Sequence, residues 1–425
     1  MKILIKSGRV IDPANKIDAV LDILVEDHKI SKVAGHIKAE ADKIIPAENK
    51  IVLPGLVDMH VHLREPGRED KETIGSGTQA ALHGGVTSVL AMPNTTPAVD
   101  SVSHLKIVQE AIKKGGQANV FICAAITQGR RGQELNDLIG LKKEGAAAFS
   151  DDGASVDSDA VMLEALRVAQ KEKLLVICHS EDRQLSCQGV VNLGLTSTRL
   201  GLRGISAESE YKRIGRDITL AKEAGASVHI AHVSCKESVE IISRAKKAGV
   251  KVTCETAPHY FTFSEEAVLG YDTNFKMNPP LRSKEDMLAI RKALSNGTID
   301  VIASDHAPHT ENEKDIEFER AEFGVVGLET ELAAAITELI NNNLIDWERL
   351  VLLMSLNPSR ILGITKGTLS PGADADIIVV DPEKTWVVKK EGLLSKSQNS
   401  SFIGRSLRGF VEYTLCRGKV HKWNS

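Results

Sequence analysis

Residues 53–67 read LPGLVDMHVHLREPG, and the rest of the chain is best interpreted outward from this stretch. An apolar run ends in His60 and His62, and Arg64 follows just before a proline–glycine pair. Side chains of a strand alternate between its two faces, so these three share one face where the extended segment ends. Two imidazoles in an HxH pattern are a weak sign of a metal site when taken alone. They gain weight only if other ligands gather at the same place.

The middle of the chain alternates short β-branched strands with amphipathic stretches such as 159–173, 236–249 and 284–297. The eight strand candidates are IVLPGLVDMHVH, GVTSVLAMPN, NVFICAAIT, GAAAFSDD, KLLVICHS, SVHIAHVS, VKVTCETAPH and IDVIASDH. A doubly wound sheet would also alternate, but no GxGxxG follows any of these strands. The pattern therefore predicts an α/β fold, a (β/α)8 TIM-type barrel over residues 52–361.

The two ends of the chain differ from the middle. Residues 1–51 and 362–425 contain strand-like runs separated by polar turns and few helical patterns. We expect the termini to pair into one small, β-sandwich-like domain beside the barrel.

Composition narrows the function class. The 425 residues carry a net charge of -4, and their basic residues are spread along the chain, which argues against nucleic acid or an anionic membrane as partner. No apolar stretch reaches the roughly 20 residues that span a bilayer, and MKILIKSGRV does not resemble a signal peptide. The six cysteines form no CxxC pair, so we expect buried thiols and a cytoplasmic protein.

In such barrels the active site lies at the carboxyl ends of the strands. Six of the thirteen histidines fall at the ends of strands one, five, six and eight. The polar residues at the ends of all eight strands are His60, His62, Asn94, Thr127, Asp151, Asp152, His179, His232, Glu255, His259, Asp305, His306 and His309. Imidazole and carboxylate are donors that zinc accepts, and four histidines with two aspartates exceed the needs of one ion. His229, three residues before His232, should face the other side of its strand and serve structure.

The motifs HVHLREPG, MPNTTP, FSDDG, HSED, HVS, NPPLR and SDHAPH occur in an order and spacing that resembles the dihydroorotases of the amidohydrolase superfamily. The resemblance covers essentially the whole chain, including GTLSPGADADIIVVDP near its end. It implies reversible, zinc-dependent hydrolysis of (S)-dihydroorotate to N-carbamoyl-L-aspartate, the third step of de novo pyrimidine (UMP) biosynthesis. It also suggests a homodimer, with aspartate transcarbamoylase as a possible additional partner.

The resemblance further implies roles for individual residues. His60, His62 and Asp305 would bind one zinc ion, and His179 and His232 the second, with Asp152 and a hydroxide bridging the two ions. Asp305 would also be the catalytic acid and base. The substrate would contact His62, Leu63, Arg64, Asn94, Asn278, His309, Phe323 and Gly324.

Many amidohydrolases bridge their two metals with a carboxylated lysine, whereas the fourth strand here reads GAAAFSDDG and has no lysine at its end. This resembles the bacterial class I type with a bridging aspartate. Aspartate is shorter than a carboxylated lysine, which predicts that one metal position is held more weakly.

Three alternatives stay open at this point. A dihydropyrimidinase or allantoinase would share the fold, but such relatives generally keep the lysine bridge and need no arginine for a substrate carboxylate. An inactive scaffold would be expected to lose metal ligands, and all six are present. Finally, the charged segment 311–323 is either a solvated surface loop or a loop that folds over the ligand.

Overall fold

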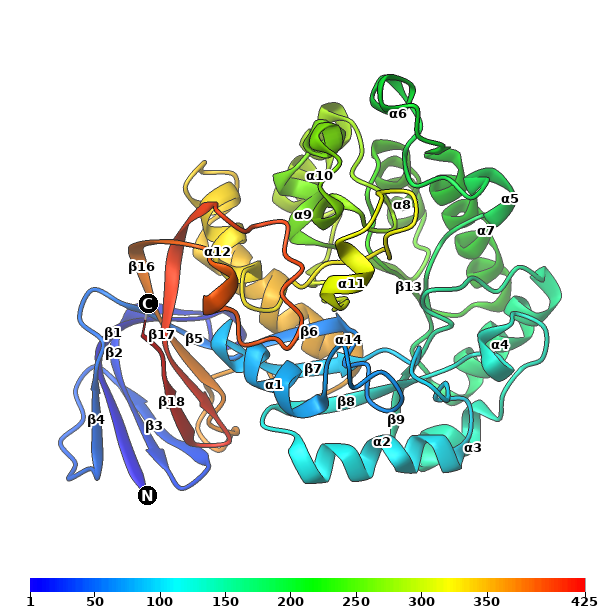
Figure 1. The fold of residues 1–425 in the computed structure, drawn as a ribbon. Coiled ribbons are helices and arrows are strands. Elements are labelled where there is room, and N and C mark those ends of the chain that lie inside the picture. Colours follow the sequence, from blue (N-terminus) through cyan, green and yellow to red (C-terminus); the bar gives the residue numbers. More distant parts are fainter. Residues whose placement is uncertain (425) are drawn as a thin grey trace.

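The computed structural model describes residues 1–424 and places strands from both ends of the chain in one eight-stranded sheet. Its order is β18-β17-β16-β5-β1-β2-β3, with β4 paired to β1. The N-terminal strands are β1 (Lys2–Asp12), β2 (Ile17–Glu26), β3 (Lys29–Ala34), β4 (Lys43–Pro46) and β5 (Ile51–Pro54), and the C-terminal ones are β16 (Ile377–Val387), β17 (Ser406–Cys416) and β18 (Lys419–Lys422). Figure 1 shows the blue and red strands side by side, with both termini beside them.

Antiparallel pairing between β16 and β5 joins the two ends of the chain, with Val379 opposite Val52. Both residues are buried in a core of aliphatic side chains that β1 and β2 share. The sheet thus begins at Lys2 and uses β5 up to Pro54, three residues past the expected boundary at 51.

Eight parallel strands make up the middle of the chain, and each of the eight predicted segments contains one: β6 (Leu56–Val61), β7 (Val86–Ala91), β8 (Asn119–Ala124), β9 (Ala146–Phe149), β10 (Ile177–Cys178), β13 (Val228–Ile230), β14 (Val252–Thr256) and β15 (Val301–Ile302). They form two four-stranded sheets, β6-β7-β8-β9 and β10-β13-β14-β15. Single parallel bridges, Phe149 with Val176 and Val61 with His306, connect these sheets at both edges. The pairings therefore link all eight strands in a cycle, here called the ring.

Helices follow most strands of the ring and cover its outside (Figure 1). They are α1 (Ile74–His83), α2 (Val102–Gly115), α3 (Leu138–Lys143), α4 (Asp159–Glu172), α7 (Glu208–Ala224), α8 (Lys236–Lys247), α10 (Lys284–Asn296), α12 (Glu331–Ala335), α13 (Trp347–Val351) and α14 (Asn357–Leu362). The three amphipathic stretches are helical as predicted, in α4, α8 and α10. α10 begins with a capping box between Ser283 and Asp286 and ends at Gly297, whose φ of 86° suits glycine. The prediction of a mixed α/β fold is confirmed.

Shorter elements lie in the connections: α5 (Arg183–Ser186), β11 (Val191–Asn192), α6 (Leu195–Leu200), β12 (Gly204–Ile205), α9 (Pro258–Thr262), α11 (Glu311–Lys314), and the short helical turns η1 (Pro13–Asn15), η2 (Gln128–Arg130), η3 (Glu265–Gly270), η4 (Thr273–Phe275), η5 (Ile336–Ile340), η6 (Leu352–Leu356) and η7 (Lys390–Gly392). In the structure up to residue 424, no helix is both long and apolar enough to cross a membrane.

The stretch IVLPGLVDMHVH is two strands rather than the single strand predicted. Residues Ile51–Pro54 belong to the terminal sheet and Leu56–Val61 to the ring. Gly55 lies between them, and a Cβ atom at this position would come within 2.2 Å of the Thr87 side chain. The chain can therefore pass from one sheet to the other only where a side chain is missing.

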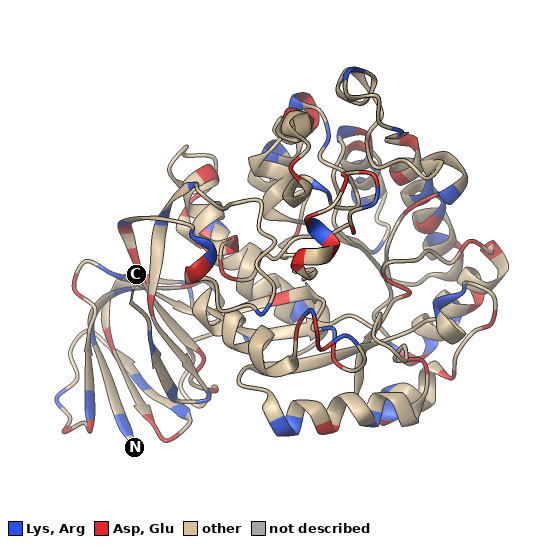
Figure 2. Cartoon of the chain, viewed as in Figure 1, with Lys and Arg blue, Asp and Glu red and all other residues tan. Residues whose placement is uncertain are grey.

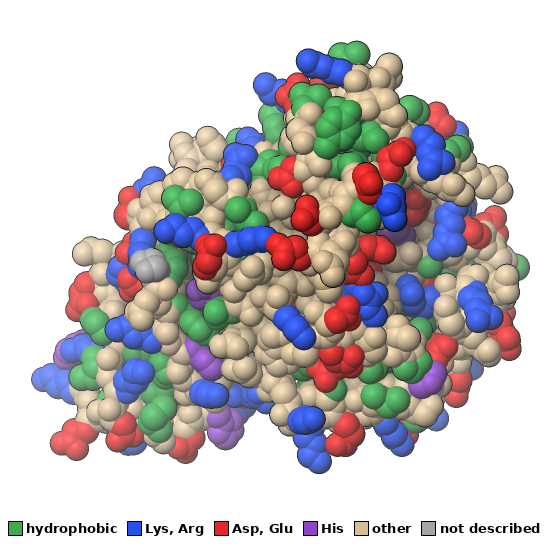
Figure 3. Space-filling model, in the orientation of Figure 1, with side chains coloured by type: hydrophobic (Ala, Val, Ile, Leu, Met, Phe, Trp, Pro, Cys, Tyr) green, Lys and Arg blue, Asp and Glu red, His purple; other side chains and the backbone are tan. Residues whose placement is uncertain are grey.

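Inside the ring, one apolar cluster collects side chains from strands all around it: Val57, Met59, Leu90, Cys123, Ala148, Ile177, Ala231, Val301 and Ala303. This packed interior leaves the polar groups at the carboxyl ends of the strands. On the surface, acidic and basic side chains are interspersed over the elements and over the face shown (Figures 2 and 3).

Candidate metal centre and active site

Strand β6 carries His60 and is fixed to the last strand of the ring by Asp58. One carboxylate oxygen of Asp58 accepts a hydrogen bond from the backbone N–H of His60 (3.0 Å), and the other accepts from Ser304 (3.1 Å). One step further, the backbone N–H of His62 donates to the carbonyl of His306 (2.9 Å). The first and eighth strand ends are thus held at the same level.

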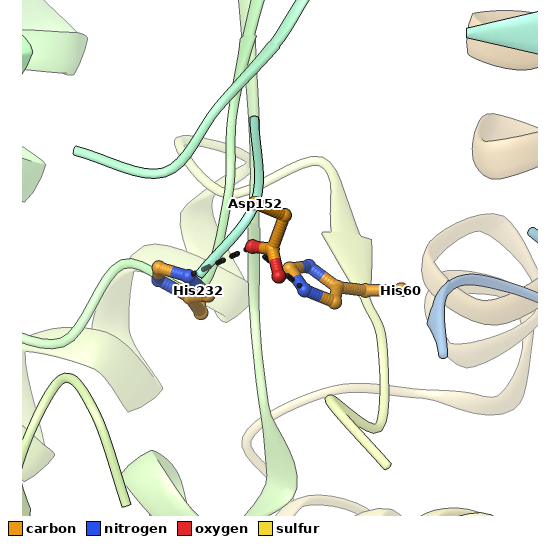
Figure 4. A group of neighbouring side chains, drawn as sticks. All are labelled: His60, Asp152 and His232. Atoms are coloured by element: carbon orange, nitrogen blue, oxygen red, sulfur yellow. Dashed lines mark ion pairs between the residues drawn. The ribbon is translucent and has the colours of Figure 1, made fainter. Parts of the chain in front are cut away.

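Four histidines surround the carboxylate of Asp152, which follows β9. Its oxygens lie 3.2 Å from His60 Nε2, 3.5 Å from His62 Nε2, 3.5 Å from His179 Nδ1 and 3.8 Å from His232 Nε2. Figure 4 shows this carboxylate between the rings of His60 and His232. The four imidazoles come from three different strand ends and share a single carboxylate.

Asp305, after β15, adds a second carboxylate on the side of the first two histidines. Its Oδ1 lies 3.3 Å from His62 Nε2 and 3.6 Å from His60 Nε2. On the other side, His179 Nδ1 is 2.8 Å from His232 Nε2. The structure thus brings together all six residues predicted as ligands, with His60, His62 and Asp305 grouped as the resemblance implied.

These residues fit a divalent cation. His60 Nε2 and Asp152 Oδ1 are buried and lack a hydrogen-bond partner, which is costly unless another group binds them. Two groups of three residues could each hold an ion, because the donor atoms within each group all lie within 4.8 Å of one another. One group is His60, Asp152 and His232, and the other is His60, His62 and Asp305. Imidazole nitrogen with carboxylate oxygen is a donor set that zinc accepts.

Both aspartates are ionised despite their burial. Burial raises the pKa of Asp152, but His60, His179 and His232 outweigh it and hold the pKa well below its usual range. For Asp305, burial is likewise outweighed by the hydrogen bond from His62 and by neighbouring histidines, and the pKa is lowered. Two carboxylates therefore offer negative charge to a cation at neutral pH.

Three residues of the site have left-handed backbone conformations that side chains rarely adopt: Arg64 (φ 62°), His232 (φ 34°) and Asp305 (φ 49°). Each such conformation costs about 1–3 kcal/mol and persists where surrounding structure imposes it. His232 is the second residue after the end of β13, and Asp305 is the third residue after the end of β15. Strain is concentrated where the ligands are.

Arg64 lies beside the first metal position, next to His309. Its Nε donates to the carbonyl of Pro308 (3.1 Å), and Nη2 lies 3.2 Å from His309 Nε2. Lys71 donates to the other nitrogen of His309 (3.0 Å). Burial lowers the pKa of Arg64 to about 10, so the guanidinium stays charged at neutral pH. This half-buried positive group suits an anionic part of a ligand.

Each of the other residues predicted to contact substrate has a different partner in the structure. Asn94 accepts from His62 Nδ1 (2.8 Å), and Asn278 donates to Glu181 (3.1 Å). The carbonyl of Phe323, next to Gly324, lies 2.8 Å from His309 Nε2. The side chain of Leu63 packs in the hydrophobic core rather than beside the proposed ligands.

Sequence analysis missed the contribution of Asn399, from the far end of the chain. Its side-chain oxygen accepts from the backbone N–H of His309 (3.1 Å), and its amide donates to the carbonyl of Gly324 (3.1 Å). Nearby, Glu72 accepts from the backbone N–H of Lys396 (3.1 Å) and from the hydroxyl of Ser395. The C-terminal segment therefore helps to form the site. A contact between residues that are 90 positions apart in the sequence leaves no signal in local periodicity.

Comparison with known proteins places this site in a family. A model of the Dihydro-orotase-like family matches residues 49–238. A protein named dihydroorotase from Elusimicrobium minutum is 54% identical over 420 residues, covering 99% of this chain and 97% of its own. The chain belongs to the dihydroorotase family. Another dihydroorotase, from Pelotomaculum thermopropionicum, is 49% identical over 99% of this chain and 98% of its own.

Solved structures similar to this dihydroorotase-family chain show the same fold in proteins with other names. An L-hydantoinase (dihydropyrimidinase) from Arthrobacter aurescens superposes with a TM-score of 0.89 at 25% identity, covering 98% of this chain and 95% of its own. A dihydropyrimidinase from Brevibacillus agri gives a TM-score of 0.86 at 23% identity, covering 99% and 95%. The fold is thus shared with proteins named hydantoinase and dihydropyrimidinase, and the sequence relatives decide the family.

Two lysines hold the segment 311–323 of this dihydroorotase-family chain in place: Lys314 connects its two ends, and Lys276 attaches it from outside. Lys314 donates to the carbonyls of Glu322 (2.8 Å) and Gly324 (3.0 Å). Lys276 donates to the carbonyl of Phe318 (2.8 Å) and lies 4.5 Å from the ring of Phe323. The segment also exposes most of its acidic side chains to solvent. It combines a solvated outer face with an inner face fixed beside His309.

The pKa of Lys314 gives a test of this attachment. Burial and Lys276 lower the pKa from 10.5 to about 7, against the opposing charges of Asp272, Glu322 and Glu313. Between these two pKa values the unfolded chain holds a proton that the folded chain has lost, so folding becomes more favourable as pH rises from 7 to 10. We expect the unfolding midpoint of the wild type, relative to Lys314→Met, to increase across this range.

Calorimetric scans of both proteins between about pH 7 and pH 10 measure this difference; its slope has an upper limit of about 1.4 kcal/mol per pH unit. Lys292→Met, at an exposed position of α10, is the control and should give a constant difference. A constant difference for Lys314→Met as well would contradict the expectation.

Proposed function

We propose that this protein is a zinc-dependent dihydroorotase that interconverts (S)-dihydroorotate and N-carbamoyl-L-aspartate in pyrimidine biosynthesis. The observation that carries the proposal is the group of four imidazoles around Asp152, with the half-buried guanidinium of Arg64 beside it. The first suits metal-assisted hydrolysis, and the second suits a substrate that bears a carboxylate. Family membership through relatives at 47–54% identity supports the same activity.

The proposal includes the finer architecture. We take the ring to be the (β/α)8 barrel and the eight-stranded sheet to be the small β-domain expected from the termini. The parallel bridges at both edges of the ring and the pairing of β5 with β16 support these assignments. A homodimer, a contact with aspartate transcarbamoylase and a cytoplasmic location remain expectations from the family resemblance.

In the proposed centre, His60, His62 and Asp305 would hold one zinc ion and His179 and His232 the other, with Asp152 shared between the two positions. Zinc bound there supplies a water of lowered pKa and polarises the amide carbonyl. The ligand set is complete without a carboxylated lysine.

The chain's own groups perform the remaining steps. Arg64 pairs with the ring carboxylate of dihydroorotate through two parallel N–H bonds, and Asn94 and His309 lie on either side of it. Asp305 takes a proton from the attacking water while the water oxygen forms a bond to the amide carbon. When the carbon–nitrogen bond breaks, Asp305 returns this proton to the ring nitrogen, which leaves as the amide of N-carbamoyl-aspartate. The reverse sequence closes the ring.

An assay on purified, metal-analysed protein tests the function. We expect ring opening of dihydroorotate at alkaline pH, ring closure of N-carbamoyl-aspartate at mildly acidic pH, and no turnover of dihydrouracil, which lacks the carboxylate. Removal of metal by a chelator should abolish both reactions, and added zinc should restore them, because zinc supplies the nucleophile. Absence of turnover despite bound zinc would contradict the proposal and favour the inactive scaffold.

Asp305→Asn tests the acid–base assignment. The amide cannot carry the proton, so we expect kcat for ring opening to fall by about 10²–10⁴. Metal content is measured on the same sample, because Asp305 is also a proposed ligand. Asp315→Asn, in the exposed part of the 311–323 segment, serves as the control and should keep wild-type kcat. Near-normal turnover of Asp305→Asn with metal bound would refute this role.

Arg64→Lys tests recognition of the carboxylate. Lysine keeps the charge but lacks the planar fork, so we expect KM for dihydroorotate to rise about 10-fold to 100-fold with a smaller change in kcat. Steady-state kinetics of this variant are compared with those of Arg9→Lys, whose side chain is 46% exposed and pairs with Asp18 in the terminal sheet. An unchanged KM for Arg64→Lys would mean that another group binds the carboxylate.

A further inference from the structure

Behind His60, on the side of its ring away from Asp152, lies a chain of buried polar groups that takes no part in the proposed reaction. Glu255, at the end of β14, has one carboxylate oxygen 2.6 Å from His60 Nδ1. Its second oxygen lies 3.1 Å from Nε2 of His229 in β13. The other nitrogen of His229 is 2.8 Å from the hydroxyl of Thr253. Glu255 and His229 are each at most 1% exposed.

The hydrogen positions in this chain follow from the chemistry of its members. The two carboxylate oxygens of Glu255 each face a ring nitrogen, at 2.6 Å from His60 Nδ1 and 3.1 Å from His229 Nε2, and a carboxylate only accepts hydrogen bonds. Both nitrogens that face Glu255 therefore carry hydrogens. His229 then accepts from Thr253, and every member of the chain is paired.

One consequence concerns His60. With its hydrogen on Nδ1, the lone pair of a neutral His60 ring is on Nε2, the atom that faces Asp152 at 3.2 Å and has no hydrogen-bond partner. This is the tautomer and the orientation that metal binding requires. His60 is also common to both groups of donor atoms that could hold a cation, so its orientation affects both positions.

A second consequence concerns charge. Two divalent cations bring four positive charges, and Asp152 and Asp305 supply only two negative ones. Glu255 adds a third through one imidazole, without taking a coordination position. The other histidines differ: His62 faces the neutral amide of Asn94, and His179 lies 3.4 Å from Glu181, which is 19% exposed. Among residues 1–424, Glu255 is the one fully buried carboxylate outside the ligand set that contacts a ligand imidazole.

We propose that Glu255, held by His229, is a positioning residue of the metal centre: it fixes the tautomer and direction of His60 and offsets part of the cationic charge. This inference rests on the proposed function, because it needs the metal centre to exist. It also gives His229 a role beyond the packing expected from the sequence. A purely structural cluster would stabilise the fold equally with and without metal, whereas a positioning chain acts on metal affinity.

The test uses the full chain carrying Glu255→Gln, which keeps the size of the side chain and removes its charge. Zinc is removed, and the affinity of the metal-free protein for zinc is measured by competition with a chromophoric chelator. We expect affinity to fall about 10-fold to 100-fold at the tighter position. The visible spectrum of the cobalt-substituted protein should change, because the orientation of His60 changes.

A second variant and a control keep the result interpretable. His229→Asn should weaken zinc binding in the same direction by less, and the double variant should lose less than the sum of the two, because the residues act in one chain. Glu331→Gln is the control for the substitution itself: Glu331 in α12 is also a fully buried glutamate, but burial raises its pKa and it contacts none of the proposed ligands. Its zinc affinity and cobalt spectrum should equal those of the wild type. Thermal unfolding of each metal-free variant reports the effect on folding separately.

The outcomes separate this inference from the proposed function. If the wild type binds zinc and turns over dihydroorotate, while Glu255→Gln and His229→Asn keep zinc affinity within twofold and an unchanged cobalt spectrum, the positioning role is overturned and the function stands. The same holds if Glu255→Gln lowers only the unfolding midpoint of the metal-free protein. A wild type that binds no zinc would overturn both.

Discussion

The carboxylate of Asp152 is the point on which the rest of the structure converges. Four imidazoles lie within 3.8 Å of it, and they belong to the first, fifth and sixth strands of the ring. Such a group can form only if parallel strands end at the same level around a common axis. Asp58 supplies part of that alignment, because its two oxygens bind backbone groups of the first and last strands. The alternation of strands and helices is thus the means by which distant histidines share one anion.

The terminal sheet contributes to the site through the segment that returns from it. After β16, residues 393–401 run back to the ring, where Asn399 binds the backbone of His309 and the carbonyl of Gly324. Glu72 meets the same segment at Ser395 and Lys396. The order of the substrate-facing residues therefore depends on the C-terminal part of the chain. Because residues 393–401 follow β16, the pairing of β16 with β5 connects the terminal sheet to the residues around His309.

Much of the fold and of the candidate site could be predicted because both leave local signals. β-branched runs predicted all eight ring strands, and polar residues just after them pointed to the ligands. The division of the first strand at Gly55 could not be predicted, since both halves are apolar and only the contact with Thr87 separates them. The pairing of Glu255 with His229 was missed because periodicity shows which residues share a face of one strand, whereas this contact joins two strands. Lys276 and Lys314 look like surface residues, and only the carbonyls that they bind reveal why they are buried.

The shared fold also shows where specificity must reside. Hydantoinase structures superpose on this chain with TM-scores of 0.84–0.89 at 22–25% identity, so strands, helices and their order do not select the ring that is cleaved. The groups that select the substrate must therefore lie beyond the strand ends. Arg64 is held there in a left-handed conformation, His309 lies against it, and the 311–323 segment is fixed behind both. Under the proposed function, the half-buried guanidinium of Arg64 would discriminate by charge: a substrate with a carboxylate would neutralise it, and a neutral ring would leave it unpaired. Covering that unpaired charge with a neutral ring would cost up to several kcal/mol, which would reject the neutral ring even where every proposed metal ligand is in place.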